Sequence, residues 1–567
     1  MRPQTRAYLA LVVLRILIAF TSTSTIHPDE HFQNPEIAAS GVFDYSGADH
    51  ALLKTWEWVG EAPCRSIIPV LGSTGAAFLA LKAVMGTAPS GWALFVAQRA
   101  VMLLSSFATD WFIWSSCRSS LALLLFASSP VTMTFLLRPF SNSLETWFFA
   151  ASIALIFRIS VRPRTRHLVL LGGAFALGIW TRVTFVAFAS PLVVAIAILL
   201  AKPVDGRAGP LAALSRLITR GLPIALAFLI TAYCLAFADT LYFRPHLTPL
   251  SIVLNPSSLV LTPLNLLRYN LSAANLADHG LHPRYLHVLV NWPMLFGAGL
   301  AVVFGSGSRL WAQRREEEGK DRRQRFMTNG EFLLACFAVP TLLLSVQPHQ
   351  EPRFLVPLIV PLVLLASQAP FLSSNTAQGK KRRKIFTVLW LTHSVLFTIL
   401  FGYLHQGGLL PAIITLNREL RNSTSPLVMG ETLDIVFWRT FMPPRHLLLP
   451  AGANELPSIR VTDMAGVAPQ LLLSTLAALP HPSSDPVSPN TSRSLLVAPA
   501  YAVDTLAAEF DSFSSTFQAT FGDRQLCLNQ LFDAQTFGVH VDMDRLGDLW
   551  GVEWESVGVG VWTVDCE

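Results

Sequence analysis

Long apolar stretches recur along the chain and constrain its fold more than any other feature. They run for about 17 to 21 residues, the length that an α-helix needs to cross a hydrocarbon core ~30 Å thick. Because no water is available to backbone groups inside lipid, each stretch must bond within itself and is predicted to be a helix. Of the 567 residues, 52% are hydrophobic and 14% are charged, whereas soluble domains carry roughly 25% charged residues. The chain is therefore predicted to be an all-α polytopic membrane protein.

Clusters of basic residues in the loops indicate how these helices are oriented. By the positive-inside rule the four clusters, at 162–167, 202–220, 309–325 and 380–384, are cytosolic. Orientation of the helices accounts for the net charge of +6, so binding of nucleic acid is not expected. The expected spans, about eleven in number, are 8–26, 92–110, 119–137, 143–160, 168–181, 184–201, 222–242, 285–304, 331–346, 354–371 and 385–404.

The apolar segment 66–85 would break the alternation of sides if it crossed the membrane. It contains Pro69, Gly72 and Gly75, which suit a re-entrant or interfacial piece better than a straight helix. We therefore expect this segment to form a hairpin on the lumenal side.

The orientation divides the chain into two expected domains. Residues 1–404 are expected to form a transmembrane domain with a lumenal loop at 27–65. Residues 405–567 contain Pro-rich loops and short apolar runs, which indicate a small lumenal domain of mixed structure. Three Asn-x-Ser/Thr tripeptides fall in segments assigned to the lumen and are candidate glycosylation sites: Asn270, Asn422 and Asn490.

The acidic stretch HPDEHFQ (27–33) follows directly after the first span. Pro28 suits the first position of a short helix, which would place Asp29 and Glu30 in its opening turn. Two interpretations are open. The acids could only complement the helix dipole, or a carboxylate held at the membrane boundary could act as a general base on a hydroxyl group.

Three arginines near the ends of spans also allow two interpretations. Arg65 is either an interfacial anchor or a contact for phosphate, which the forked guanidinium group suits well. Arg138 and Arg182 lie at turns between spans, where arginine most often extends its charged end to the membrane surface.

The lumenal turn QPHQEPRF (347–354) carries more polar groups than a connector needs. His349, Glu351 and Arg353 crowd a turn of a few residues between two apolar spans, which favours a functional role. In HQGG (405–408), at the last exit from the membrane, the glycines either end a helix or belong to a substrate site.

Several common sites are missing from the sequence. It contains no P-loop, no GxGxxG after a strand and no HExxH, so a nucleotide or ATP site of the soluble kind is not expected. Charged residues within the spans, such as Arg15 and Arg99, are few. This argues against an ion-coupled transporter.

Five motifs together resemble one known family. They are HPDEHFQ (27–33), RPFSNSLET (138–146), NLADHGLHPRYLH (275–287), HQEPRF (349–354) and HQGG (405–408). These motifs resemble the membrane-embedded mannosyltransferases of the C-type (GT-C) fold, glycosyltransferase family 22, which use dolichyl-phosphate mannose as donor. The family pattern in the fourth motif has a lysine where this chain has Gln350, so no role for a lysine can be transferred.

Within the family, segment 262–287 and RPFSNSLET look most like members that add the fourth mannose to the glycosylphosphatidylinositol (GPI) precursor. The resemblance implies an inverting transfer in α-1,2 linkage in the endoplasmic reticulum membrane, with a lumenal active site. Asp29 would take the proton of the acceptor hydroxyl, and Glu30 could share or orient that task. The other residues expected to bind substrate or phosphate are His27, Arg65, Arg138, His349, Glu351 and Arg353.

The resemblance implies no metal and no cofactor, because phosphate is already a good leaving group. The expected partners are dolichyl-phosphate mannose, the GPI glycolipid precursor and membrane lipids. Two alternatives stay open. One is a mannosyltransferase that adds the third GPI mannose or extends the N-glycan precursor, and the other is a lipid transporter or scramblase without catalysis.

Overall fold

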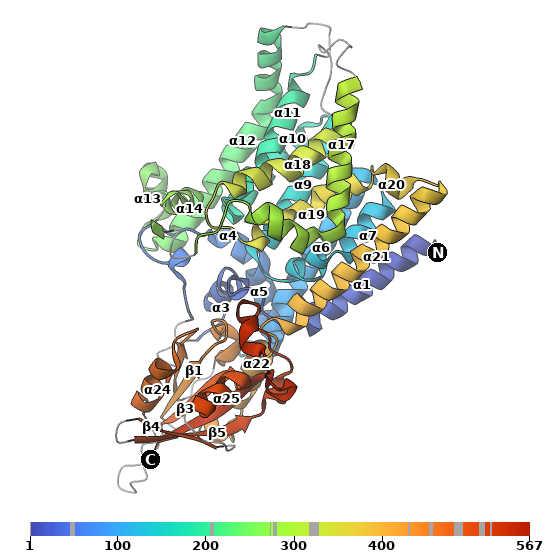
Figure 1. Cartoon of the computed structure of the whole chain (residues 1–567). Coiled ribbons are helices and arrows are strands. Elements are labelled where there is room, and N and C mark those ends of the chain that lie inside the picture. The colour runs from blue at the N-terminus through green and yellow to red at the C-terminus, as the bar shows by residue number, and fades with distance from the viewer. Residues whose placement is uncertain are drawn as a thin grey trace. The chain divides into compact units, whose positions relative to one another are not determined.

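The computed structural model describes residues 2–45, 52–203, 209–272, 274–275, 280–316, 328–428, 431–452, 457–480, 492–509, 516–521 and 524–566. Helices make up nearly all of the described chain up to Leu420, and a six-stranded sheet with accompanying helices follows (Figure 1). The fold class expected from the sequence is thus confirmed: a helical membrane protein with a small mixed C-terminal domain.

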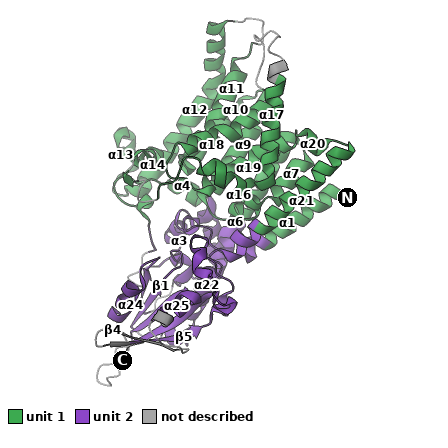
Figure 2. Cartoon of the chain, viewed as in Figure 1, with its two compact units in different colours: residues 1–17, 55–72, 102–396 green, residues 18–54, 73–101, 397–567 purple. Residues whose placement is uncertain are grey.

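The chain divides into two compact units (Figure 2). The first comprises residues 1–17, 55–72 and 102–396, and the second comprises residues 18–54, 73–101 and 397–567. The C-terminal sheet therefore belongs to the same unit as the HPDE stretch. The domain boundary expected at residues 404 and 405 stays a prediction.

Within the described residues, seven helices are long and apolar enough to cross a membrane. A bent pair, Ser120–Ser128 and Pro130–Leu137, would make an eighth, with a 52° angle between its halves. Three other expected spans are shorter apolar helices: Phe185–Ala201, Asn329–Ser345 and Pro352–Ala366.

The helices of the first unit pack closely around α10 (Thr165–Thr181). It contacts α9 (Ser141–Val161) and α12 (Pro210–Phe243). Gly172 allows the second contact, because a Cβ atom there would lie 2.2 Å from the carbonyl oxygen of Ile224. Small residues let helix backbones approach closely in membrane proteins.

Segment 66–85 is one continuous helix, and the expected hairpin is wrong. It consists of α4 (Ile67–Val70), a π-helical turn (Leu71–Gly75) and α5 (Ala76–Met85). Pro69 lies in the first helical turn, where backbone N–H groups have no partner inside the helix, so its missing N–H removes no bond. Gly72 and Gly75 lie in the wider π turn and do not interrupt the helix.

The arginine inside the first span has an acidic partner. Arg15 donates to Asp110 at 2.9 Å, and Tyr8 donates to the same carboxylate at 2.7 Å. The Arg15 side chain is fully buried. A charge inside a membrane is costly unless it has such a partner.

The C-terminal sheet has the strand order β2-β1-β3-β6-β5-β4. The first three strands are parallel to one another, and the last three pair in antiparallel fashion. Helices α24 (Pro469–Ala478) and α25 (Ala500–Glu509) contribute to its apolar core, together with strand residues such as Leu496 and Leu528. The strands are β1 (Thr432–Phe437), β2 (Ser458–Asp463), β3 (Arg493–Pro499), β4 (Thr516–Phe521), β5 (Arg524–Phe532) and β6 (Val559–Cys566).

The HQGG motif joins the last long helix, α21 (Ala377–Ile399) with its π turn (Leu400–Leu404), to the sheet domain. The Gln406 N–H donates to the carbonyl oxygen of Val541 at 2.9 Å. A Cβ atom on Gly407 would lie 2.4 Å from the carbonyl oxygen of Val539. Of the two roles considered for these glycines, the structure supports a structural one.

The candidate glycosylation sites differ in exposure. Asn270 is half-buried in α14 (Thr262–Leu271), and Asn422 is exposed in the turn after α22 (Leu409–Leu420). Asn490 lies outside the described residues.

Candidate active site

The HPDE stretch forms the short helix α2 (Asp29–Phe32), with Asp29 and Glu30 in its first turn as expected. Helix α3 (Pro35–Val42) follows after two residues. Both helices belong to the second unit.

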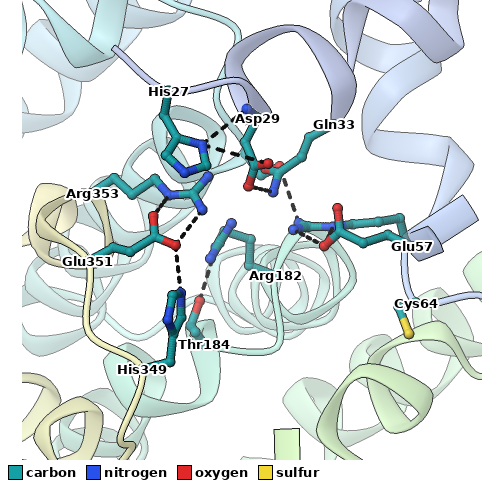
Figure 3. Close-up of polar contacts among 12 residues, drawn as sticks. His27, Asp29, Gln33, Glu57, Cys64, Arg182, Thr184, His349, Glu351 and Arg353 are labelled. Carbon is teal, nitrogen blue, oxygen red and sulfur yellow. Dashed lines mark hydrogen bonds and ion pairs between the residues drawn. The ribbon is translucent and has the colours of Figure 1, made fainter. Parts of the chain in front are cut away.

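The two acids of this stretch have different surroundings. The Asp29 side chain is 26% exposed, and its carboxylate accepts a hydrogen bond from the side chain of Gln33 (Figure 3). His27 Nδ1 accepts a hydrogen bond from the Asp29 N–H at 3.1 Å. Glu30 is fully buried and paired with Arg99 at 2.8 Å. Asp29 is therefore the acid that a substrate hydroxyl could reach.

Three arginine–glutamate pairs characterise the first unit: Arg65–Glu57, Arg182–Glu145 and Arg353–Glu351. Each of the six side chains is at most 15% exposed. Burial strengthens the field of a charge because little water remains to screen it. Little water therefore screens the guanidinium groups of these three pairs, which are called the arginine–glutamate set below.

Arg65 is fixed by two elements. Its Nε and Nη2 donate to Glu57 Oε1 at 2.8 and 2.6 Å, and its Nη1 donates to Ser141 Oγ at 3.3 Å. Ser141 is the first residue of α9. The arginine thus connects the loop before α4 with the start of a long helix.

Arg182 lies in the turn between α10 and α11 (Phe185–Ala201). Its Nε donates to Thr184 Oγ1 at 3.3 Å (Figure 3). The same Nε lies 3.7 Å from Glu145, and Thr184 donates to Glu145 at 2.7 Å. Its Nη1 is buried and has no hydrogen-bond partner among the described residues. Burial, with the nearby charges of Arg65 and Arg353, lowers the pKa of Arg182 to about 10. It stays cationic at neutral pH and has a donor to offer to an anion.

His349 and Arg353 bind the same carboxylate. His349 Nε2 bonds to Glu351 Oε1 at 2.7 Å, and Arg353 Nη2 donates to that oxygen at 2.8 Å (Figure 3). Burial lowers the pKa of His349, but the hydrogen bond and charge of Glu351 outweigh it, so the pKa lies above its ordinary value. The turn therefore holds an arginine and a histidine that readily takes up a proton.

The side chain of Gln350 links several backbone groups around this turn by hydrogen bonds. Its Nε2 donates to the carbonyl oxygens of Arg284, Ser345 and Gln347 at 3.2 to 3.3 Å, and its Oε1 accepts from the His287 N–H at 3.0 Å. The residue is 1% exposed. Gln350 therefore has a structural role, although it stands where the family pattern has a lysine.

The arginines at the ends of the spans do not extend to a membrane surface. Arg138 is fully buried, and Arg65 and Arg182 are 6% and 7% exposed. The anchor interpretation is therefore wrong for all three. Arg65 and Arg182 belong to the arginine–glutamate set.

The sequence did not identify several polar residues that contact or position the arginines of the first unit. Glu57, Glu145 and Thr184 were not singled out, and Asp239 of α12 was overlooked as well. Asp239 accepts hydrogen bonds from Ser66 Oγ, the Ile67 N–H and Thr262 Oγ1, all within 3.0 Å. An acid inside an apolar stretch is costly unless it is paired, and that cost alone could have identified Glu145 and Asp239.

Each unit supplies one kind of chemical group. The first unit supplies buried guanidinium donors, which suit the geometry of phosphate. The second unit supplies an accessible carboxylate on a short helix. No group of three or more His, Cys, Asp or Glu side chains in the described part of the chain is arranged to hold a metal ion.

Comparison with known proteins gives consistent matches. Residues 6–450 match the model of the Alg9-like mannosyltransferase family. GPI mannosyltransferase 4 of Aspergillus oryzae is 30% identical over 95% of this chain and 94% of its own length. GPI alpha-1,2-mannosyltransferase 4 of Homo sapiens is 32% identical over 82% of this chain and 79% of its own length. Among solved structures, apo ArnT from Cupriavidus metallidurans aligns with a TM-score of 0.49 at 13% identity, covering 92% of this chain and 97% of that one.

Proposed function

We propose that this chain, which belongs to the Alg9-like mannosyltransferase family, transfers the fourth mannose to the GPI precursor. The donor would be dolichyl-phosphate mannose and the new linkage α-1,2. The relatives from Aspergillus oryzae and Homo sapiens, whose names specify GPI mannosyl transfer, support this acceptor. The reaction would take place in the endoplasmic reticulum membrane, on its lumenal side, as the distribution of basic loops suggests.

The observation that carries the proposal is the arginine–glutamate set of the first unit. When the sugar of a lipid-linked sugar phosphate is transferred, the lipid phosphate leaves as a phosphate monoester. Its negative charge grows as the bond to the sugar breaks. Fixed donors aimed at developing charge stabilise a transition state strongly. Arg182 has an unpartnered buried donor, and Arg353 and Arg65 are held by their glutamates. We assign the phosphate to these three residues, with His349 as an additional positive group when protonated.

Asp29 is the proposed general base. Its carboxylate would take the proton of the acceptor hydroxyl while the hydroxyl oxygen forms a bond to the anomeric carbon. The bond from that carbon to the phosphate oxygen would break at the same time, and its electron pair would leave with the phosphate. Attack on the face opposite the leaving group inverts the configuration. Because phosphate is a good leaving group, this scheme requires no cofactor.

The substrate is tested by analysing lipid precursors in cells that lack the protein. We expect a GPI intermediate with three mannoses to accumulate, and microsomes with the protein to convert it to the four-mannose form. If only the dolichol-linked oligosaccharide were extended, the proposed acceptor would be wrong.

The base is tested with Asp29→Asn. This change keeps the shape of the side chain and removes only its basicity, so we expect near-complete loss of transfer at normal protein abundance. A lipid transporter or scramblase would not need the carboxylate, and its activity would survive the change.

A further inference from the structure

Helix α2, which carries Asp29, and the following helix α3 are each held by a buried acid that the proposed mechanism does not require as a base. Glu30 of α2 pairs with Arg99 of α6 (Gly91–Cys117) at 2.8 Å. Glu36 of α3 lies 2.5 Å from Nδ1 of His446, in helix α23 (Arg445–Leu448). All four side chains are fully buried within the second unit.

Glu36 connects three parts of the second unit. Its Oε2 accepts the backbone N–H of His446 at 3.1 Å as well as facing the imidazole ring. Its Oε1 accepts the N–H of Leu53 at 3.3 Å. A single carboxylate thus links helix α3, the end of the loop that follows it and the C-terminal region.

The two ion pairs are in contact through α6 and through His31. Gln98, next to Arg99 on α6, places its Oε1 3.2 Å from Nε2 of His446. The His31 ring lies 5.9 Å from the His446 ring, and its Nε2 lies 3.9 Å from Glu30. The polar groups therefore form a continuous buried row from Arg99 to Glu36.

The His446 ring has a hydrogen-bond partner at each of its nitrogens. Both nitrogens of the His446 ring face oxygen atoms, a carboxylate on one side and an amide on the other. A buried charge that loses its partner is strongly unfavourable, because nothing else compensates for its lost hydration. Each pair therefore holds its helix in one position.

We propose that His446 is a positioning residue for Asp29. Through Glu36 it fixes α3 and the preceding turn, so that the C-terminal region determines where the Asp29 carboxylate stands. Glu30 acts in the same way through Arg99 and is not a second base. The proposal rests on the proposed function of Asp29, and it gives the C-terminal region a role in catalysis beyond stability. A displacement of about 1 Å at a reacting group can lower a rate about a hundredfold.

The test uses the full-length protein in microsomes from cells that lack their own copy. The variants are Glu36→Gln, His446→Gln and the double variant, each assayed for mannose transfer to the three-mannose GPI precursor and normalised to protein abundance. Each single change leaves one buried polar side chain without its partner. We expect kcat to fall by about tenfold or more, with the KM for dolichyl-phosphate mannose nearly unchanged. The double variant replaces the pair with two amide side chains that can bond to each other, so most of kcat should return.

The matched control is Arg460→Gln, which breaks an ion pair with Asp434 in the sheet of the same unit. We expect this change to leave kcat unaltered, even if less protein accumulates. If the Glu36 and His446 variants lowered only abundance, as a merely structural pair would, the positioning role would be overturned. Single and double variants with equally low kcat would also overturn it.

Asp29→Asn, assayed in parallel, separates this inference from the proposed function. Activity in Asp29→Asn would refute the base itself. An inactive Asp29→Asn beside a fully active His446→Gln would refute only the positioning role.

Discussion

Arg182 and Arg353 lie against the same aromatic ring. The central guanidinium carbons of the two residues are 5.3 Å and 5.6 Å from the centre of the Phe354 ring. Two like charges held this close repel each other, and this repulsion contributes to the lowered pKa of Arg182. A dianionic phosphate would relieve it. The shared ring therefore holds two cations in a position that favours an anion.

Replacement of Arg182 tests this interpretation. Arg182→Gln removes the charge and the unpartnered Nη1 donor, so we expect kcat to fall by about 10²- to 10³-fold, as for loss of one donor to a developing anion. Arg182→Lys keeps the charge without the fork and should retain part of the activity. Transfer rates in microsomes, normalised to abundance, provide the measurement. A wild-type rate in Arg182→Gln would exclude the residue from the phosphate site.

Asp239 should affect the reaction through Arg65. Its carboxylate holds Ser66 and the first N–H of α4, directly after the arginine. Asp239→Asn turns one acceptor atom into a donor, which we expect to cost about 1–3 kcal/mol of stability and to raise the KM for the lipid donor. Thr262→Val is the matched control, since it removes only one of the hydrogen bonds to Asp239. Unchanged KM and thermal stability in Asp239→Asn would contradict this role.

The raised pKa of His349 predicts a pH-dependent contribution to stability. The protonated ring is favoured in the folded protein, so its stabilising pair with Glu351 is fully present below the ordinary histidine pKa of about 6.5. That stability is lost as the pH rises through the higher folded pKa. The Tm difference between wild type and His349→Gln should therefore shrink as the pH is raised above about 6.5. A constant difference would show that the histidine is not charged in the pair.

Gln350→Lys tests whether the lysine of the family pattern is structural. A lysine ammonium has three donors and could serve the three carbonyl oxygens that Gln350 now serves. It cannot accept from the His287 N–H, so we expect a loss of about 1–3 kcal/mol for that unpaired donor, with kcat nearly unchanged. Gln350→Met, which serves none of these groups, should be less stable than Gln350→Lys. A large fall in kcat for a stable Gln350→Lys protein would indicate a direct catalytic role for this position.

His540 gives the second unit the opposite pH dependence. Burial, with a contribution from His405, lowers the pKa of His540 to about 3. The neutral ring is favoured in the folded state, so its stability is fully present above the ordinary value of about 6.5 and is lost as the pH falls towards 3. The slope of the unfolding free energy against pH should approach about 1.4 kcal/mol per pH unit, which corresponds to one proton taken up on unfolding. Tm measured from about pH 7 to about pH 5 should fall more steeply in wild type than in His540→Met.

The sequence predicts the membrane architecture well because apolar length and basic loops are local properties. Asp29 and Glu30 occupy the first turn of a short helix, as the preceding proline suggests. The hairpin expected at 66–85 is wrong because neither the proline nor the glycines interrupt the helix. Pro69 stands in a first turn that tolerates it, and a π turn takes up Gly72 and Gly75.

The partners of the arginines could not be predicted in the same way. Most arginines at the ends of spans lie at the membrane surface, and this local rule predicts the same place for Arg182. Its actual partner, Glu145, is on another helix and 37 positions earlier in the chain. Glu36 and His446 are 410 positions apart. Pairings of this kind follow from tertiary packing, to which local pattern gives no access.

The separation of Glu36 and His446 also determines when in its own synthesis the protein can become active. A ribosome completes the HPDE stretch early, and His446, the partner of Glu36, follows only after the seven long apolar helices of the described residues have been made. An unfinished or truncated chain that ends before α23 would thus insert its helices and still lack a correctly placed base. The order of synthesis would keep incomplete chains from acting on the lipid donor.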